Sequence, residues 1–206
     1  VNPEVLERYD IVGFDPRGIG LSSPIACLSD SEQEASLTSD AKPDNEAEYA
    51  QALKDTQEFI DKCVAKTPNL AHYSTREAAH DMELLRKALG DKQLNYLGFS
   101  YGTYLGTLYA QLFPAKVGRF VLDGAVDPQI SIEQQAKVQA VAFDQALANF
   151  ITDCHKLKSC PLPKDATATF FTDLFNKVSQ TPLTIGDRKI TEGLVVTGTA
   201  SALYDD

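Results

Sequence analysis

The stretch NYLGFSYGTYLGTLYA, residues 95–110, decides the fold. Its pentapeptide GFSYG fits G-x-S-x-G, the nucleophile-elbow pattern, in which Ser100 would occupy a sharp turn between a strand and a helix. Such a turn crowds the backbone, so the residues two before and two after the serine must be small. Gly98 and Gly102 meet that requirement. The pattern carries meaning only if a strand leads into it and a helix leads out.

The flanking sequence predicts both elements. Residues 93–99, QLNYLGF, are typical of a strand, and YGTYLGTLYAQLF then indicates a helix that Pro114 ends. Before the strand, a helix is predicted from Ser74, with a glutamate three residues on as in a capping box, to Gly90. A second strand is predicted at 118–124. This alternation is typical of a parallel sheet with crossover helices, and it puts the serine at the carboxyl edge where such sheets carry their chemistry.

The first part of the chain adds less regular features. RYDIVGFDPRG predicts a short buried strand at residues 9–14, followed by a turn. Residues 29–48 are polar and acidic without a strong period, which predicts a surface loop. Residues 46–66 have the apolar spacing of a helix.

After residue 126 the character of the sequence changes. The apolar spacing predicts helices at 131–156 and 167–179, a small hairpin in LTIGDRKIT, and a further helix from Thr191. We therefore expect two domains. Residues 1–125 would be a partial α/β core carrying the elbow, and residues 126–206 a mainly helical cap.

Composition and charge exclude several classes of partner. The chain has 206 residues, of which 43% are hydrophobic, so it can bury a core. Its net charge of −10 argues against nucleic acid or an anionic membrane as the main partner, because both attract basic surfaces. No apolar run approaches the roughly 20 residues of a membrane span. We expect no metal and no cofactor, since neither a metal-ligand pattern nor a nucleotide-binding loop is present.

The four cysteines, Cys27, Cys63, Cys154 and Cys160, permit two disulfides in three connectivities. The alternatives are four free thiols in a cytosolic protein, or a metal site at Cys154, His155 and Cys160, whose spacing matches no common zinc pattern. We favour disulfides and therefore an exported protein.

The elbow indicates nucleophilic catalysis. A serine hydroxyl is a weak nucleophile at neutral pH, and it needs an adjacent base and donors for the oxyanion that forms. The turn would lift the hydroxyl of Ser100 clear of the sheet. The backbone N–H of Tyr101 would be one oxyanion donor, aided by the positive end of the helix dipole.

Four separated segments carry a resemblance to a known family. YDIVGFDPRGIGLSSPIAC, STREAAHDMELLRKAL, LNYLGFSYGTYLG and FPAKVGRFVLDGAVDP together resemble the α/β-hydrolase fold. More narrowly, they are similar to the exported tripeptidyl aminopeptidase and prolyl aminopeptidase-like serine peptidases of actinobacteria. The resemblance runs from about residue 8 to 128. It implies a mostly parallel sheet with flanking helices and a helical cap.

The resemblance also implies roles for particular residues. It makes Ser100 the nucleophile and Tyr101 an oxyanion donor, and it pairs Cys27 with Cys63 and Cys154 with Cys160. It places Asp15, Arg17, Gly18 and Gly20 in the turn after an early core strand. We interpret Asp15 and Arg17 as an ion pair that fixes this loop.

The other members of a catalytic triad are not evident. In this fold the order is Ser, then Asp or Glu, then His. His72 and His80 precede the serine, and His155 lies in the stapled cap loop. Asp123 and Asp127 follow the second strand, and we interpret Asp123 as a turn residue. We therefore expect an incomplete α/β-hydrolase core, a fragment whose triad acid and base come from the remainder of the enzyme or from a second chain.

Three functions follow as hypotheses. The first is a serine aminopeptidase that forms an acyl-enzyme on Ser100 and acts on peptides with free N-termini. Glu133, Asp144, Asp153 and Glu192 lie where a cap acid could hold the substrate ammonium, and nothing selects one of them. The second is an esterase or lipase-like enzyme of the same fold. The third is a non-catalytic binding protein on a degenerate hydrolase scaffold.

Overall fold

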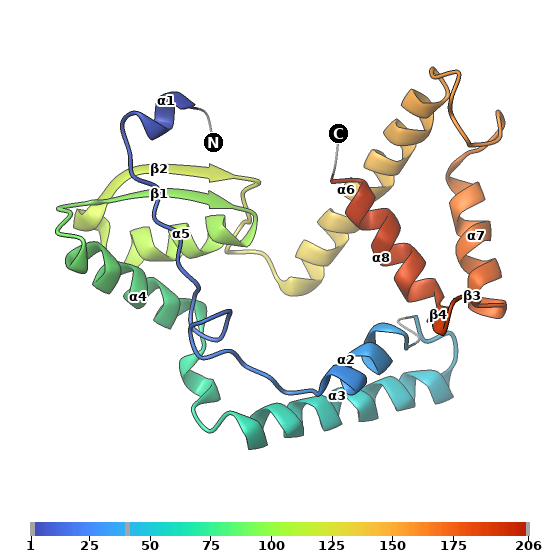
Figure 1. Cartoon of the computed structure of the whole chain (residues 1–206), viewed down its shortest axis with the longest axis horizontal. Helices are drawn as coiled ribbons and strands as arrows, with labels where there is room; N and C mark the ends of the chain where they lie inside the picture. Colours follow the sequence, from blue (N-terminus) through green and yellow to red (C-terminus); the bar gives the residue numbers. More distant parts are fainter. Residues whose placement is uncertain (1–2, 40–41, 205–206) are drawn as a thin grey trace. The chain divides into compact units, whose positions relative to one another are not determined.

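Two parallel strands and the helices beside them carry Ser100. In the computed structural model, which describes residues 3–39 and 42–204, β1 (Leu94–Phe99) pairs in parallel with β2 (Val117–Asp123). The helix α5 (Tyr101–Leu112) follows β1 and packs against both strands, and α4 (Thr75–Ala88) packs on α5 (Figure 1). The predicted alternation of helix and parallel strand is confirmed.

Local signals explain these boundaries. The side chain of Ser74 caps α4 by accepting a hydrogen bond from the backbone N–H of Glu77, and Gly90 follows the helix with a φ of 80°. Pro114 starts a short 3₁₀ helix, η2 (Pro114–Lys116), which ends α5 and leads into β2.

A single apolar cluster joins α4, α5 and the strands. Its buried members are Ala78, Ala79, Met82, Leu105 and Tyr109, and partly buried residues of both strands pack against it.

The remaining elements complete two units. The first unit comprises Val1–Cys27 and Ile60–Gln129, and the second comprises Leu28–Phe59 and Ile130–Asp206. Besides the sheet, the first holds α1 (Pro3–Leu6) and η1 (Leu70–His72). The helix α3 (Glu46–Lys66) runs from the second unit into the first. The division predicted at residue 125 stays a prediction.

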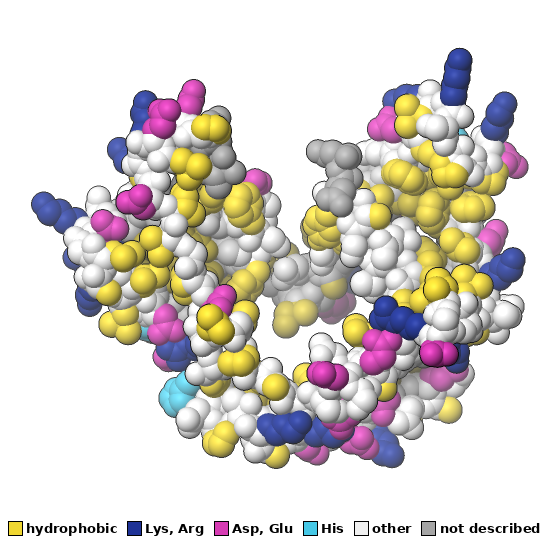
Figure 2. Space-filling model, in the orientation of Figure 1, with side chains coloured by type: hydrophobic (Ala, Val, Ile, Leu, Met, Phe, Trp, Pro, Cys, Tyr) yellow, Lys and Arg dark blue, Asp and Glu magenta, His cyan; other side chains and the backbone are white. Residues whose placement is uncertain are grey.

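The second unit is mainly helical. Its elements are α2 (Asp30–Leu37), α6 (Ile132–Cys154), α7 (Ala168–Gln180), an antiparallel hairpin of β3 (Leu183–Ile185) and β4 (Arg188–Ile190), and α8 (Glu192–Ala202). A bidentate ion pair between Arg188 of β4 and Glu34 of α2, at 2.8 and 3.2 Å, links its two chain segments. Figure 2 shows Lys and Arg side chains interspersed with Asp and Glu on the visible face. None of the helices in the described part of the chain combines the length and apolar character needed to cross a bilayer.

Two local predictions are wrong. Residues 9–14 form no strand, because a strand needs a hydrogen-bonded neighbour and no described strand pairs with them. Their link to the sheet is a hydrogen bond that Arg119 donates to the hydroxyl of Tyr9, at 2.8 Å. Within 29–48, where we predicted a loop, the capping box of Ser29 and Glu32 starts the helix α2.

Candidate active site

Ser100 adopts a strained backbone conformation at the corner between β1 and α5. Its φ is 49° and its ψ is −117°, outside the regions that L-residues normally occupy. Among the described residues, only Ser23 is another non-glycine residue with positive φ. Such a conformation costs on the order of 1–3 kcal/mol and persists where the surrounding structure enforces it.

Hydrogen bonds hold both sides of this residue. The N–H of Ser100 donates to the carbonyl of Asp123 at the end of β2, at 2.9 Å. The carbonyl of Ser100 accepts from the N–H of Thr103 at 2.9 Å and from its hydroxyl at 2.7 Å. The corner is therefore fixed to the neighbouring strand on one side and to the first turn of α5 on the other.

The two flanking glycines allow a close backbone approach. A Cβ added to the buried Gly98 would lie 2.6 Å from the carbonyl oxygen of Gly102. That oxygen accepts a hydrogen bond from the hydroxyl of Tyr96, at 2.8 Å. Burial raises the pKa of the Tyr96 phenol, so it keeps the proton that it donates. The requirement for a small residue thus has a direct steric cause at Gly98, whereas a Cβ added to Gly102 would meet only the hydroxyl of Tyr96, at 3.2 Å.

Ser100 and Tyr101, which carry the groups that chemistry would use, are both exposed. Ser100 is exposed, and its hydroxyl has no hydrogen-bond partner in residues 3–39 and 42–204. Tyr101 is the first residue of α5, so its N–H has no acceptor within the helix and lies at the positive end of the helix dipole. Its phenol shares a hydrogen bond of 2.7 Å with the hydroxyl of Thr75, the first residue of α4. The roles of nucleophile and oxyanion donor stay predictions.

The histidines and acids weighed from the sequence make other contacts. The ring of His80 packs edge-on against Phe113, with ring centroids 5.2 Å apart. The Nε2 atom of His155 lies 2.9 Å from the carbonyl oxygen of Pro163. The carboxylate of Asp127 accepts from the N–H of a residue two positions on, at 2.9 Å. None of these side chains is hydrogen-bonded to the serine hydroxyl in the part of the chain described.

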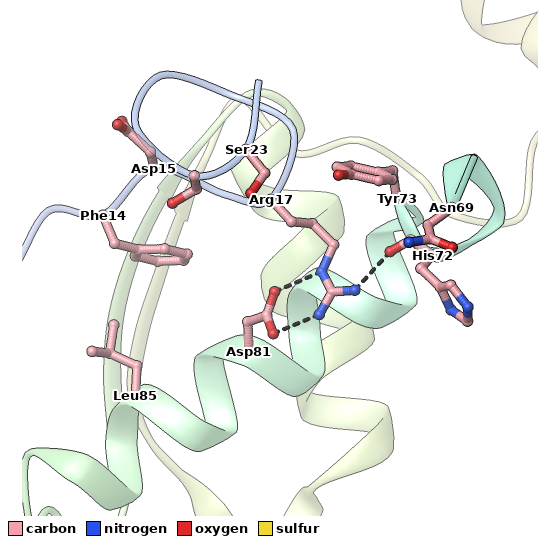
Figure 3. Close-up of a pocket in the computed structure, with 10 residues that line it drawn as sticks. Phe14, Asp15, Arg17, Ser23, Asn69, His72, Tyr73, Asp81 and Leu85 are labelled. Carbon is pink, nitrogen blue, oxygen red and sulfur yellow. Dashed lines mark hydrogen bonds and ion pairs between the residues drawn. The ribbon is translucent and has the colours of Figure 1, made fainter. Parts of the chain in front are cut away.

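The turn after residue 14 is fixed by different partners from those expected. Arg17 makes a bidentate pair with Asp81 of α4, at 2.7 and 2.6 Å, and it donates to the backbone carbonyl of His72 at 2.7 Å (Figure 3). Asp15 instead accepts from the N–H of Leu21 at 2.8 Å. The expected pair of Asp15 with Arg17 is therefore wrong, although both side chains hold this loop.

A surface hollow of about 590 Å³ surrounds this ion pair. The residues that line it come from the loop, from the segment around η1 and from α4: Phe14, Asp15, Arg17, Ser22, Ser23, Asn69, His72, Tyr73, Asp81 and Leu85 (Figure 3). The sequence analysis did not predict it, because its walls come from segments about 50 residues apart in the chain.

A buried charged network was also missed. Arg86 donates to both carboxylate oxygens of Glu83, at 2.8 and 2.7 Å, and to the backbone carbonyl of Asp91. The hydroxyl of Tyr109 on α5 donates to the same carboxylate at 2.9 Å. The hydrogen bonds from Arg86 lower the pKa of Glu83 to about 2, and burial raises the pKa of Tyr109 to about 12. The network therefore joins α4 to the helix that follows Ser100.

The cysteines form two disulfides, Cys27–Cys63 and Cys154–Cys160, which are the pairs implied by the resemblance. No cysteine is free. In the described residues, no group of three or more His, Cys, Asp or Glu side chains gathers as metal ligands.

Comparisons with known proteins give a family and several relatives. The model of the family described as "alpha/beta hydrolase fold" matches residues 1–202. Serine protease Hip1 of Mycobacterium tuberculosis (strain ATCC 25618 / H37Rv) is 42% identical over 165 residues, covering 78% of this chain and 32% of that protein. Tripeptidyl aminopeptidase of Streptomyces lividans is 44% identical over 141 residues, 67% of this chain and 26% of that protein.

A third relative is an esterase by name. Carboxylesterase B of Mycobacterium tuberculosis (strain CDC 1551 / Oshkosh) is 35% identical over 207 residues, 98% of this chain and 40% of that protein. The chain thus spans about a third of the length of the curated relatives it matches.

Proposed function

Because this chain belongs to the alpha/beta hydrolase fold family, we propose that it carries the nucleophile of a serine hydrolase, with Ser100 as that nucleophile. The observation that carries the proposal is the conformation of Ser100, whose φ is 49° in an exposed corner between β1 and α5. A strained residue of this kind at the carboxyl end of a parallel strand is the arrangement in which this fold presents its nucleophile.

The proposed reaction passes through an acyl-enzyme. The Ser100 oxygen attacks the carbonyl carbon of the substrate while a base removes the hydroxyl proton. The N–H of Tyr101, free of an intrahelical acceptor, donates to the resulting oxyanion. Collapse of this intermediate expels the leaving group, which takes the proton, and water then hydrolyses the acyl-enzyme.

The relatives are longer than the region that they share with this chain. We propose that the base and its orienting acid belong to a part of the enzyme that corresponds to this additional length. Ser100 has no such partner in the described residues, and the chain covers 32% of Serine protease Hip1. The face of the sheet opposite α5 carries exposed apolar side chains. This supports the proposal that a further segment, of the same polypeptide or of a second chain, covers it. Leu97, Phe99 and Val121 are 45%, 61% and 58% exposed there, and apolar groups of a sheet are normally covered.

The proposed substrate is a peptide with a free N-terminus, because two of the relatives are named a serine protease and a tripeptidyl aminopeptidase. Residues 1–125 would form the core and residues 126–206 a mainly helical cap. The two disulfides support an oxidising, exported location. Ester hydrolysis is the second candidate, favoured by the similarity to Carboxylesterase B over 98% of the chain.

The test compares the 206-residue chain with the longest natural polypeptide that contains it. We expect the longer protein to cleave a tripeptide anilide with a free N-terminus, and Ser100→Ala to abolish turnover and fluorophosphonate labelling. Ser23→Ala is the matched control, because Ser23 is also a serine with positive φ, and it should retain activity. The 206-residue chain alone should be slower by about 10⁶-fold, because a triad serine without its base loses nearly all of its rate advantage.

The remaining outcomes separate the alternatives. Equal cleavage of the N-acetylated peptide, or cleavage of esters alone, would favour the esterase. Full activity of the Ser100→Ala variant would overturn the proposal, and absence of any labelling would favour a non-catalytic binding protein.

A further inference from the structure

The hydroxyl of Thr103 lies where both sides of the Ser100 corner meet. Thr103 is 1% exposed. Its hydroxyl donates to the carbonyl of Ser100 at 2.7 Å and accepts from the backbone N–H of Val126 at 2.9 Å. This one buried hydroxyl therefore donates a hydrogen bond to one backbone segment beside the candidate nucleophile and accepts a hydrogen bond from the other.

The second of those segments passes close to Ser100. Gly124 follows β2 with a φ of 69°, and a Cβ added there would lie 3.7 Å from the nitrogen of Ser100. Asp123, one residue earlier, accepts the hydrogen bond from that nitrogen. The chain that leaves β2 thus fixes the N–H side of Ser100, and through Val126 and Thr103 it also fixes the carbonyl side.

A strained residue needs such a double restraint. The ψ of Ser100 is −117°, which orients the peptide plane that joins it to Tyr101. The Ser100 carbonyl and the Tyr101 N–H belong to that one plane, so a bond that fixes the carbonyl also fixes the N–H. Threonine suits the position because its branched Cβ restricts the hydroxyl to few rotamers.

We propose that Thr103 is a positioning residue, whose hydroxyl holds Ser100 in its strained conformation and thereby aims the Tyr101 N–H. The first part concerns backbone structure alone. The second part rests on the proposed function, since it assumes that this N–H serves an oxyanion.

Hydrogen exchange tests the structural part in the 206-residue chain. Thr103→Val removes the hydroxyl at nearly constant volume, and Thr103→Ser keeps it. Thr107→Val is the matched control, because Thr107 makes the same kind of bond one turn later, to the carbonyl of Thr103 at 2.8 Å, away from the corner. We expect the Ser100 amide to exchange about tenfold faster or more in Thr103→Val, and within about threefold of wild type in the other two.

The amide of the buried Leu105 in the same helix reports global opening. If Thr103→Val accelerates exchange of the Ser100 and Leu105 amides by the same factor, Thr103 only stabilises the fold as a whole. That result would overturn the proposal. An unchanged rate at Ser100 would overturn it too. If Thr103→Val does not fold, Thr103→Cys replaces it, because a thiol is a weak donor of similar size, and the same acceleration is expected.

Kinetics tests the second part in the longest natural polypeptide that contains the chain. We expect Thr103→Val to lower kcat by about 100-fold with KM little changed, because a small misplacement of a reacting group has that effect. Thr103→Ser should restore most of the rate. A loss confined to KM would overturn this part. If Ser100→Ala leaves turnover unchanged, the proposed function fails instead, and the exchange result still decides the structural part.

Discussion

The corner depends on Gly98 because the next helix lies directly against it. An added Cβ would lie 2.6 Å from the carbonyl oxygen and 2.8 Å from the carbonyl carbon of Gly102. These are backbone atoms of α5, which cannot rotate away as a side chain could. We expect Gly98→Ala to lower the free energy of unfolding by about 2 kcal/mol, the usual cost of overpacking. Urea denaturation of the 206-residue chain measures this change.

Gly13 provides the control for this substitution. Apart from its two neighbours in the chain, no atom of the described residues lies within 4 Å of a Cβ added there, so Gly13→Ala should change stability by no more than about 0.5 kcal/mol. A Gly98→Ala variant as stable as Gly13→Ala would contradict the steric explanation of the glycine pattern.

At the scale of single residues, the sequence predicts the functional residues that belong to one short motif. The G-x-S-x-G pattern was sufficient to locate Ser100 and its two glycines. It could not reveal that Arg17 pairs with Asp81, because these residues are 64 positions apart and no local spacing encodes the contact. The double role of the Thr103 hydroxyl also depends on where the chain goes after β2.

The pairing of α4 with α5 depends on a buried carboxylate. Hydrogen bonds from Arg86 lower the pKa of Glu83 to about 2, while an unfolded chain would have a pKa of about 4.3. The folded state therefore binds fewer protons at this site than the unfolded state. Its stabilising contribution is complete above about pH 4.5 and is lost as the pH falls towards 2.

Unfolding measured between pH 6 and pH 2.5 tests this linkage. We expect wild type to be more stable than Glu83→Gln at pH 6, and the difference to shrink as the pH falls. Glu58→Gln is the control, since Glu58 is an exposed partner of Lys54 at 3.9 Å and its loss should change neither stability nor slope. A difference between wild type and Glu83→Gln that stays constant with pH would contradict the assignment.

The elements themselves were largely predictable. The bounds of α3 are those predicted from its apolar spacing, and α4 has the predicted serine cap, because periodicity and capping are local properties. The strand predicted at residues 9–14 does not form, because a strand requires a hydrogen-bonded partner strand. The helix α2 was missed because its capping box begins a segment with little apolar periodicity. Glu83 and Arg86 resemble surface residues by type, although they lie on the same side of α4 as the buried Ala79 and Met82.

On the scale of the whole chain, each compact unit is built from two separate segments of the sequence. The chain leaves the first unit after Cys27 and returns to it at Ile60. The ion pair of Glu34 with Arg188 joins residues 154 positions apart within the second unit. No local pattern encodes such a pairing, so it could not be predicted from the sequence.

The two disulfides close chain segments of very different length. Cys27 and Cys63 are 36 positions apart, whereas Cys154 and Cys160 are 6 apart. In the chain-entropy description, a longer loop restricts the unfolded state more. We therefore expect Cys27→Ser with Cys63→Ser to cost about 4 kcal/mol of stability, and Cys154→Ser with Cys160→Ser about 2 kcal/mol. Denaturation of the two double variants without reductant measures the difference.

The order of these two losses is the informative result. Cys27, Cys63 and Cys154 are each 7–8% exposed, and Cys160 is partly buried. Each pair has at least one buried sulfur atom to lose, and the separation of the two cysteines, 36 against 6 positions, is the largest difference between the pairs. A larger loss from the short loop would contradict the entropic explanation. It would place the stabilisation in the folded state at the end of α6, where the ring of His155 already contacts the carbonyl of Pro163 across the loop.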